Sequence, residues 1–225
     1  GRLRGEGFAA QADQLQNLFS QELRKEYSAF AACFSFHRDD AAQWERYGNR
    51  GRGVCIAFRG DLLRRMAEGP LSLHTVFYED DMTGHPMVDR FCRLIRDREA
   101  LTGCERDIRL AMRDAWACSV AFKHPSFSSE DEVRLVVAPF GQEEFDVQPR
   151  YHVTKERVKK YYPLDLQDMC GRAGAALEEL VAEIIIGPES TQSLAILRDY
   201  LRDNGLAPLA ENVSLSDCPL RGMPV

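Results

Sequence analysis

Gly53-Val54-Cys55-Ile56-Ala57-Phe58 is the stretch that decides the fold, because five apolar residues follow one another without a polar break. A continuous apolar run of this length is typical of a strand in a sheet that is covered on both faces. Short strands are also predicted over 29–35 before it and over 183–186 near the end of the chain. We therefore expect a domain built around a buried sheet.

Helices are predicted where apolar residues recur every three or four positions. Helices are predicted over 8–27, 61–66, 173–180 and 191–204, and one or two more within 86–123. A further helical turn carries Trp44 and Tyr47, with Asp39 as its cap and Gly48 at its end. Further strands are predicted over 73–78, 132–138, 144–148, 158–162 and 212–215, and a turn over 124–129. The expected fold class is α+β (mixed α/β), a single domain over 1–225 with helices packed around a mixed central sheet.

The composition limits the classes of protein and of partner. A chain of 225 residues can bury a hydrophobic core without disulfides or a structural metal. Its seven cysteines include no Cys-x-x-Cys pair. We expect reduced thiols in a cytoplasm, no metal cofactor and no disulfide framework, with secretion as an effector left open. The net charge of −6 argues against a nucleic-acid partner, and no apolar run is long enough for a membrane span.

The segment Ser128-Ser129-Glu130-Asp131-Glu132-Val133-Arg134 is the most suggestive of function. If the strand begins early enough, alternation places Glu130, Glu132 and Arg134 on one face. One carboxylate can then stabilise an oxocarbenium-like carbon, and the other can orient or deprotonate a nucleophile. The alternative, which spacing alone favours, is an exposed strand edge with Glu132 and Arg134 paired on a solvated face.

Other residues are weaker candidates. Ser35 ends a predicted buried strand and can face a pocket there or simply cap the next turn. Trp44 and Tyr47 lie three apart on one helical face, where they can stack on a nicotinamide or adenine ring or bury in a core. His124 precedes a proline without metal-ligand spacing and is expected to be structural. The loop 48–53 is rich in glycine and offers Arg50 or Arg52 to a phosphate, but it does not run from strand into helix.

An ordered set of segments resembles a bacterial family catalogued as domain of unknown function 2971. The order of these segments is more specific than any one of them, and together they span nearly the whole chain. The matching segments are Ala32-Cys33-Phe34-Ser35, Gln43-Trp44-Glu45-Arg46-Tyr47-Gly48, 51–58, Phe122-Lys123-His124, 130–135, 184–188 and 213–221.

The motif layout of that family resembles ADP-ribosyltransferases. By this likeness Ser35 matches the serine-bearing strand, Glu132 is the catalytic carboxylate and Glu130 the one that orients the acceptor. The likeness implies NAD as a substrate in the cleft between them. The basic residue of a first strand has no counterpart in 1–32, so the chain begins after that strand, another segment supplies it, or the domain has lost NAD chemistry. The residues expected to contact NAD are Phe34, Ser35, Trp44, Tyr47, His124 and Arg134.

Three functions follow from this pattern. The leading one transfers ADP-ribose from NAD to a protein side chain, with arginine as a candidate acceptor. The second is a non-catalytic binding or regulatory module that acts on a protein partner and keeps the cleft without turnover. The third is a metal-dependent hydrolase or nuclease that uses Asp39, Asp40, Glu130 and Glu132 as oxygen ligands. The acidic balance and the lack of a metal-binding motif count against the third.

Overall fold

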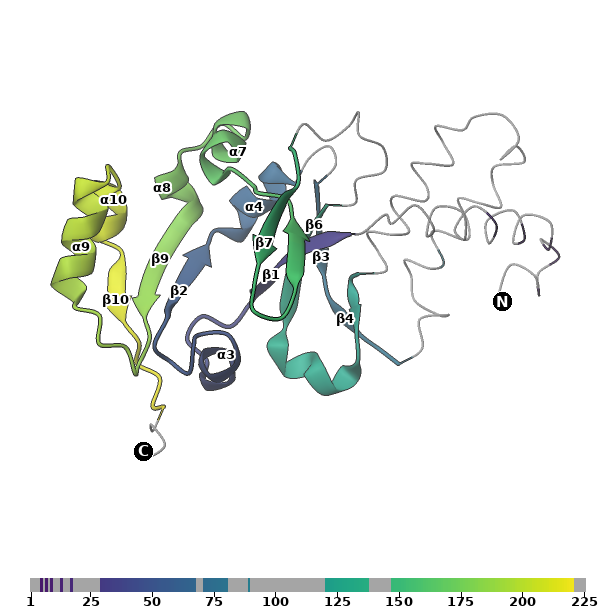
Figure 1. Cartoon of the computed structure of the whole chain (residues 1–225), viewed down its shortest axis with the longest axis horizontal. Helices are drawn as coiled ribbons and strands as arrows, with labels where there is room; N and C mark the ends of the chain where they lie inside the picture. Colours follow the sequence, from purple (N-terminus) through teal and green to yellow (C-terminus); the bar gives the residue numbers. More distant parts are fainter. Residues whose placement is uncertain are drawn as a thin grey trace. The chain divides into compact units, whose positions relative to one another are not determined.

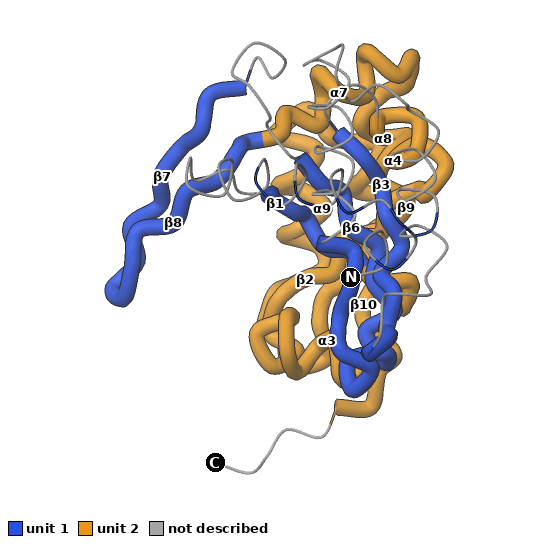
Figure 2. The backbone as a smooth tube through the Cα atoms, turned by 90° about the vertical axis from the view of Figure 1, so that its right-hand side faces the viewer, with its two compact units in different colours: residues 1–34, 68–163 blue, residues 35–67, 164–225 orange. Residues whose placement is uncertain are grey.

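A computed structural model describes residues 29–67, 71–80, 120–137 and 147–220, together with residues 5, 7, 9, 13, 17 and 89. The chain divides into two compact units (Figure 2). Unit 1 comprises residues 1–34 and 68–163, and unit 2 comprises residues 35–67 and 164–225. Each unit is therefore assembled from two segments that the other unit interrupts in the sequence.

The main sheet of unit 1 has three strands in the order β1-β6-β3. These strands are β1 (Phe30–Ser35), β6 (Glu132–Val137) and β3 (Leu71–Thr75), and β3 runs antiparallel to β6. The central position of β6 explains its apolar second half, because a strand with two neighbours and a covered face suits β-branched and aliphatic side chains. Leu135, Val136 and Val137 are accordingly among the most buried residues of the chain.

Two smaller sheets complete the described part of unit 1. The short strands β4 (Phe77–Tyr78) and β5 (Phe122–Lys123) pair in parallel, and a 3-10 helix, η1 (Pro125–Glu130), then leads into β6. The strands β7 (Arg150–Val153) and β8 (Val158–Tyr161) form an antiparallel hairpin. The predicted turn over 124–129 is thus a 3-10 helix, with Pro125 in its first turn.

The sheet of unit 2 has the order β10-β9-β2. The central strand β9 (Val181–Ile186) pairs in parallel with β10 (Val213–Leu215) and antiparallel with β2 (Val54–Phe58). The helices α9 (Leu194–Asp203) and α10 (Ala207–Ala210) lie beside β9 and β10 (Figure 1). The buried residues shared by these elements are Val181, Ile184, Ile186, Leu201, Leu209, Ala210 and Val213.

Four further helices of unit 2 are α3 (Ala41–Arg46), α4 (Gly60–Met66), α7 (Leu166–Arg172) and α8 (Leu177–Leu180). The predicted cap of α3 was wrong by one residue. Asp40, and not Asp39, caps this helix, because its carboxylate accepts hydrogen bonds of 2.9 and 3.0 Å from two backbone N–H groups of the first turn.

Several sequence predictions need correction. β2 is a strand, as predicted, but it is not covered on both faces: it lies at a sheet edge, and Val54 and Ile56 are 48% and 46% exposed. The predicted helix over 173–180 is broken, because α7 ends at Arg172 and a left-handed Gly174 precedes α8. Residues 147 and 148 form no strand, contrary to the prediction for 144–148.

The fold class is confirmed as mixed α+β. The described strands pair in four small sheets, and a single central sheet is not shown. The predicted strand over 73–78 is divided between β3 and β4, whereas those over 29–35, 132–138, 158–162 and 212–215 are confirmed within two residues at either end. The predicted helices over 8–27 and most of 86–123 lie outside the described residues.

Candidate functional site

The candidate site of unit 1 is built where β5, η1 and β6 follow one another. The register of β4 and β5 places Tyr78 beside Lys123. Glu130 is the last residue of η1, and Glu132 is the first residue of β6. Asp131 between them has a left-handed backbone with φ of 42° and ψ of 60°, which turns the chain from the 3-10 helix into the strand.

Lys123 joins the two glutamates. Its Nζ lies 2.6 Å from Oε2 of Glu130 and 2.9 Å from Oε1 of Glu132. Both carboxylates are buried, with relative exposures of 2% for Glu130 and 6% for Glu132. The same Nζ lies 4.9 Å from the ring centroid of Phe127, so the cation also has an aromatic face near it.

Arg134 closes the other side of Glu132. Its Nε and Nη2 donate hydrogen bonds of 2.8 and 2.6 Å to Oε2 of Glu132, and its Nη1 donates to the carbonyl oxygen of Val120. Both oxygens of the Glu132 carboxylate are thus held by cations. We call Lys123, Glu130, Glu132 and Arg134 the charged cluster.

The two glutamates converge for a reason that strand alternation did not give. The condition for a shared strand face is not met, because β6 begins at Glu132, as predicted, and Glu130 lies in η1. The left-handed turn at Asp131 brings the two carboxylates to one cation instead. The alternative of a solvated Glu132–Arg134 pair was half right: the pair exists, but Glu132 is buried.

The charged cluster is balanced, with two carboxylates against two cations. Desolvation lowers the pKa of Lys123, but its hydrogen bonds to Glu130 and Glu132 outweigh that effect, so the pKa is raised. Desolvation, followed by the charge of Glu132, raises the pKa of the Cys33 thiol on β1. Lys123 is therefore a firmly protonated member of the cluster, and Cys33 beside it is a protonated thiol at neutral pH.

The other residues predicted for this site, Phe34, Ser35 and His124, are not members of the charged cluster. Phe34 and Ser35 end β1, the strand next to β6 in the sheet, and the Ser35 hydroxyl accepts a 3.1 Å hydrogen bond from the backbone N–H of His37. His124 caps η1: its Nδ1 accepts from the backbone N–H of Ser126, and its Nε2 lies 3.4 Å from a carboxylate oxygen of Asp80.

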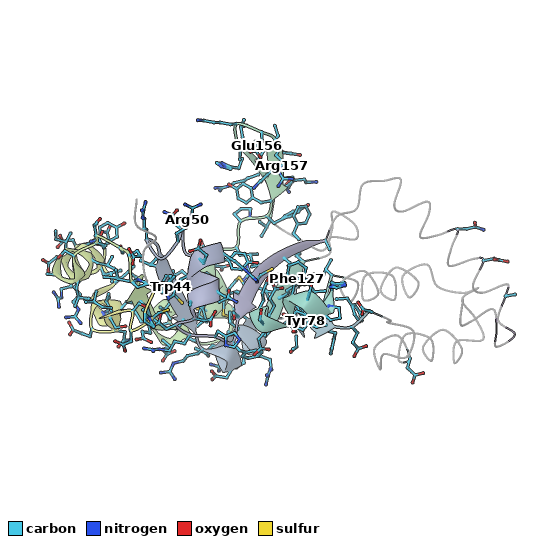
Figure 3. The ribbon with its side chains drawn as sticks, turned by 90° about the horizontal axis from the view of Figure 1, so that it is seen from below. Trp44, Arg50, Tyr78, Phe127, Glu156 and Arg157 are labelled. Carbon is cyan, nitrogen blue, oxygen red and sulfur yellow. The ribbon has the colours of Figure 1, made fainter. Side chains whose placement is uncertain are left out.

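The predicted aromatic pair belongs to unit 2, and the structure treats its members differently. Trp44 is 3% exposed, and its indole N–H donates a 2.5 Å hydrogen bond to Asp39. Tyr47 follows the end of α3 and is 66% exposed. Beyond it, Asn49 and Arg50 have φ of 53° and 55°, so this loop holds two non-glycine residues in left-handed conformations (Figure 3 labels Trp44 and Arg50).

The oxygen ligands predicted for the hydrolase alternative are divided between the units, with Asp39 and Asp40 in unit 2 and Glu130 and Glu132 in unit 1. Within the described part of the chain, no group of three or more histidine, cysteine, aspartate or glutamate side chains is arranged to hold a metal ion. Among the helices that the structure describes, none is long and apolar enough to cross a bilayer.

Sequence reasoning missed two members of the site. Lys123 was noticed only as part of a family segment, although a lysine seven residues before an acidic pair offers a counter-charge. Tyr78 gave no sequence signal, because its role depends on the pairing of β4 with β5 and on a 2.8 Å hydrogen bond from the backbone N–H of Glu132.

Comparison with protein-family models identifies DUF2971, a protein family of unknown function, over residues 43–135. The resemblance stated from the sequence is therefore confirmed over a segment that runs from α3 to β6 and includes Lys123, Glu130, Glu132 and Arg134. Comparisons with curated proteins and with solved structures gave no match.

Proposed function

We propose that this protein transfers ADP-ribose from NAD to a protein side chain, with arginine as the leading acceptor, and that its fold is ADP-ribosyltransferase-like. The observation that supports the proposal is the convergence of Glu130 and Glu132 on Lys123, with Arg134 on the far side of Glu132. Two carboxylates that lie close together can stabilise the positive charge of a cationic transition state, and here two cations orient one of them.

In this proposal Glu132 is the catalytic carboxylate. The bond between the ribose C1′ and the nicotinamide nitrogen breaks, and nicotinamide leaves with the bonding electrons as a neutral base. The positive charge that develops on the ribose is stabilised by the Glu132 carboxylate. The acceptor nitrogen then bonds to C1′ and loses a proton to Glu130, so that one bond is broken and one is formed.

A ribose hydroxyl that binds Glu132 shares the carboxylate with Lys123 and Arg134. Oε2 of Glu132 accepts two hydrogen bonds from Arg134 and Oε1 accepts one from Lys123, and a carboxylate oxygen with one such bond can accept another from a ribose hydroxyl. The diphosphate of NAD carries two negative charges that Arg134 or Lys123 can pair with. Binding of NAD would thereby weaken the contact of one cation with Glu132 as the ribose arrives.

The described cysteines support a reducing cytoplasm as the place of this activity. Cys33, Cys55, Cys170 and Cys218 are all free thiols. Free thiols persist in a reducing compartment and tend to oxidise outside it.

The test is transfer of labelled ADP-ribose to arginine-bearing proteins, combined with thermal unfolding with and without millimolar NAD. NAD at about 100 times its Kd stabilises a protein by roughly 2.7 kcal/mol, which is a visible shift in Tm. We expect Glu132→Gln to abolish transfer while it keeps the stabilisation by NAD. Glu211→Gln, which changes an exposed carboxylate of unit 2, is the matched control and should transfer normally. Transfer that persists in Glu132→Gln would overturn the proposed role.

A second function is favoured by the closure of the charged cluster itself. Two buried carboxylates that are fully compensated by cations form a stable arrangement without any ligand. Such a cluster suits a binding or regulatory module that acts on a protein partner without turnover. Stabilisation by NAD without transfer in the wild-type protein would favour this second function, and detectable transfer that Glu132→Gln abolishes would exclude it.

A further inference from the structure

The β7–β8 hairpin is an exposed two-stranded ribbon. Every residue of β7 and β8 is exposed, and among the described strands the two pair only with each other. Figure 2 shows them side by side, leading away from β1, β3 and β6 of the same unit. The base of the hairpin is anchored, because the ring of Tyr162 meets that of Phe30 at 4.8 Å in an edge-to-face contact.

The hairpin concentrates positive charge in an acidic protein. Residues 150–162 contain five lysines and arginines against the single Glu156, a net charge of +4. The whole chain has 29 lysines and arginines against 35 aspartates and glutamates, so the rest of the chain carries −10. In the described part of the chain, no carboxylate forms an ion pair with Arg150, Lys155, Arg157, Lys159 or Lys160.

The register of the hairpin separates its side chains by face. Arg150 lies opposite Tyr161 and His152 opposite Lys159, so these four side chains share one face, which we call the basic face. The other face carries Tyr151 and Val153, which are 64% and 72% exposed, together with their partners on β8. The turn at the tip is charged, and Figure 3 labels two of its residues, Glu156 and Arg157.

We propose that the β7–β8 hairpin binds a nucleic acid and contacts its sugar–phosphate backbone through the basic face. Arg150 and Lys159 are diagonal neighbours across the two strands, at a typical separation of about 7–8 Å, which suits a polymer with regularly repeated negative charges. A two-stranded ribbon is also an element that the major groove of duplex DNA admits. Tyr161, on the basic face, adds a ring on which an unpaired base can stack.

A membrane surface fits the hairpin less well. A ribbon that lies on a bilayer needs cations around an apolar face or an apolar tip that can enter the lipid. Here Arg150, His152 and Lys159 lie on the face opposite Tyr151 and Val153, although Tyr161 shares the first face and Lys160 the second. The tip carries Lys155, Glu156 and Arg157, so it is not apolar. The net charge of −6 led to an expectation of no nucleic-acid partner, but an average over the chain hides a local excess of cations.

The test measures the fluorescence anisotropy of a labelled DNA of about 20 nucleotides, single-stranded or duplex, with the full chain and without NAD. We expect binding at about 50 mM salt that weakens steeply as salt is raised. The double variant Arg150→Gln and Lys159→Gln should weaken it by about tenfold or more. The slope of log affinity against log salt should become shallower by about 1.8 on duplex or about 1.4 on single-stranded DNA.

The matched control is the double variant Arg64→Gln and Arg65→Gln, which removes two exposed positive charges from α4. It should bind DNA as the wild type does, and all variants should keep the wild-type Tm because the changed side chains are exposed. Tyr161→Ala should weaken binding to single strands more than to duplex if bases stack on that ring. Absence of DNA binding, an equal loss in both double variants, or tighter hairpin-dependent binding to phosphatidylserine vesicles would overturn the proposal.

Discussion

The backbone N–H of Glu132 donates a 2.8 Å hydrogen bond to the hydroxyl oxygen of Tyr78, 54 residues earlier in the chain. This bond ties β4 to the first residue of β6, so it helps to fix the position of a carboxylate that Lys123 and Arg134 also hold. Because Glu132 is buried, its N–H has little access to water as an alternative partner.

Tyr78→Phe should therefore lower the free energy of unfolding by about 1–2 kcal/mol, since a buried N–H loses its acceptor while the aromatic ring is retained. Urea denaturation measures the change. Tyr200→Phe, at a 60% exposed tyrosine of α9, is the control and should have no measurable effect. Equal stability of Tyr78→Phe and the wild type would show that the N–H finds another acceptor.

Lys123→Met should lower the free energy of unfolding more than most single substitutions in the described part of the chain. It leaves Glu130 and Glu132 buried without their shared cation, although Arg134 still compensates Glu132. We expect a loss of about 2–4 kcal/mol, reduced from the value for a fully buried pair because a fifth of the Lys123 side chain is exposed.

The double variant Lys123→Met and Glu130→Gln checks this explanation, because it removes one of the uncompensated charges and should recover part of the stability. Arg172→Met breaks an exposed ion pair with Asp168 and should change little. If Lys123→Met and Arg172→Met were equally stable, the charged cluster would not contribute to folding.

Asp131 holds a left-handed backbone that only some residues tolerate. Asp131→Val should lose about 1–2 kcal/mol of stability, because a β-branched side chain is strained at positive φ. Asp131→Gly should stay within about 1 kcal/mol of the wild type. Thermal unfolding of the two variants decides the matter, and a valine variant as stable as the glycine variant would contradict the role assigned to this turn.

Gly187 follows β9 at a place where two backbone segments come close. A Cβ on this residue would meet the backbone of Gly51 and would lie 3.0 Å from the carbonyl oxygen of Gly53. Gly187→Ala should therefore destabilise the protein by roughly 1–3 kcal/mol. Gly171→Ala, in α7, has no atom within 4 Å of the added Cβ and should instead stabilise by about 0.5–1 kcal/mol. Opposite signs in chemical denaturation are the expected result.

The ion pair between Arg38 and Glu183 makes the stability of unit 2 depend on pH. Arg38 donates hydrogen bonds of 2.6 and 2.5 Å to the two oxygens of Glu183, and these bonds lower the pKa of the Glu183 carboxyl. Because the folded pKa lies below the unfolded one, the contribution is complete above about pH 4.3 and is lost as pH falls through the folded value.

Stability measured between pH 7 and pH 3 should therefore fall less steeply in Arg38→Gln than in the wild type. Because Arg38 is exposed, high salt screens its interaction with Glu183, so the comparison belongs at low ionic strength. An unchanged pH profile in Arg38→Gln would mean that other carboxylates govern the acid limb.

The sequence alone determined the class of the fold and most of the strands. Local patterns placed the strands that became β1, β6, β8, β9 and β10, because apolar runs and turn residues act over a few positions. It also selected Glu130, Glu132 and Arg134 as a group, since their spacing within five residues is a local property. The helix breaks near Arg172 and Gly174 were missed, because left-handed residues give a weak local signal.

Only the tertiary structure decided how those residues meet. The parallel pairing of β4 with β5 places Tyr78 beside Lys123. Tyr78 then contacts Glu132, which is 54 positions later in the sequence, and Lys123 contacts Glu130, which is seven positions later. The edge position of β2 left Val54 and Ile56 exposed, although their apolar run predicted full burial. Burial and pairing depend on which segments become neighbours across the chain, and hydrophobic pattern within one segment does not contain that information.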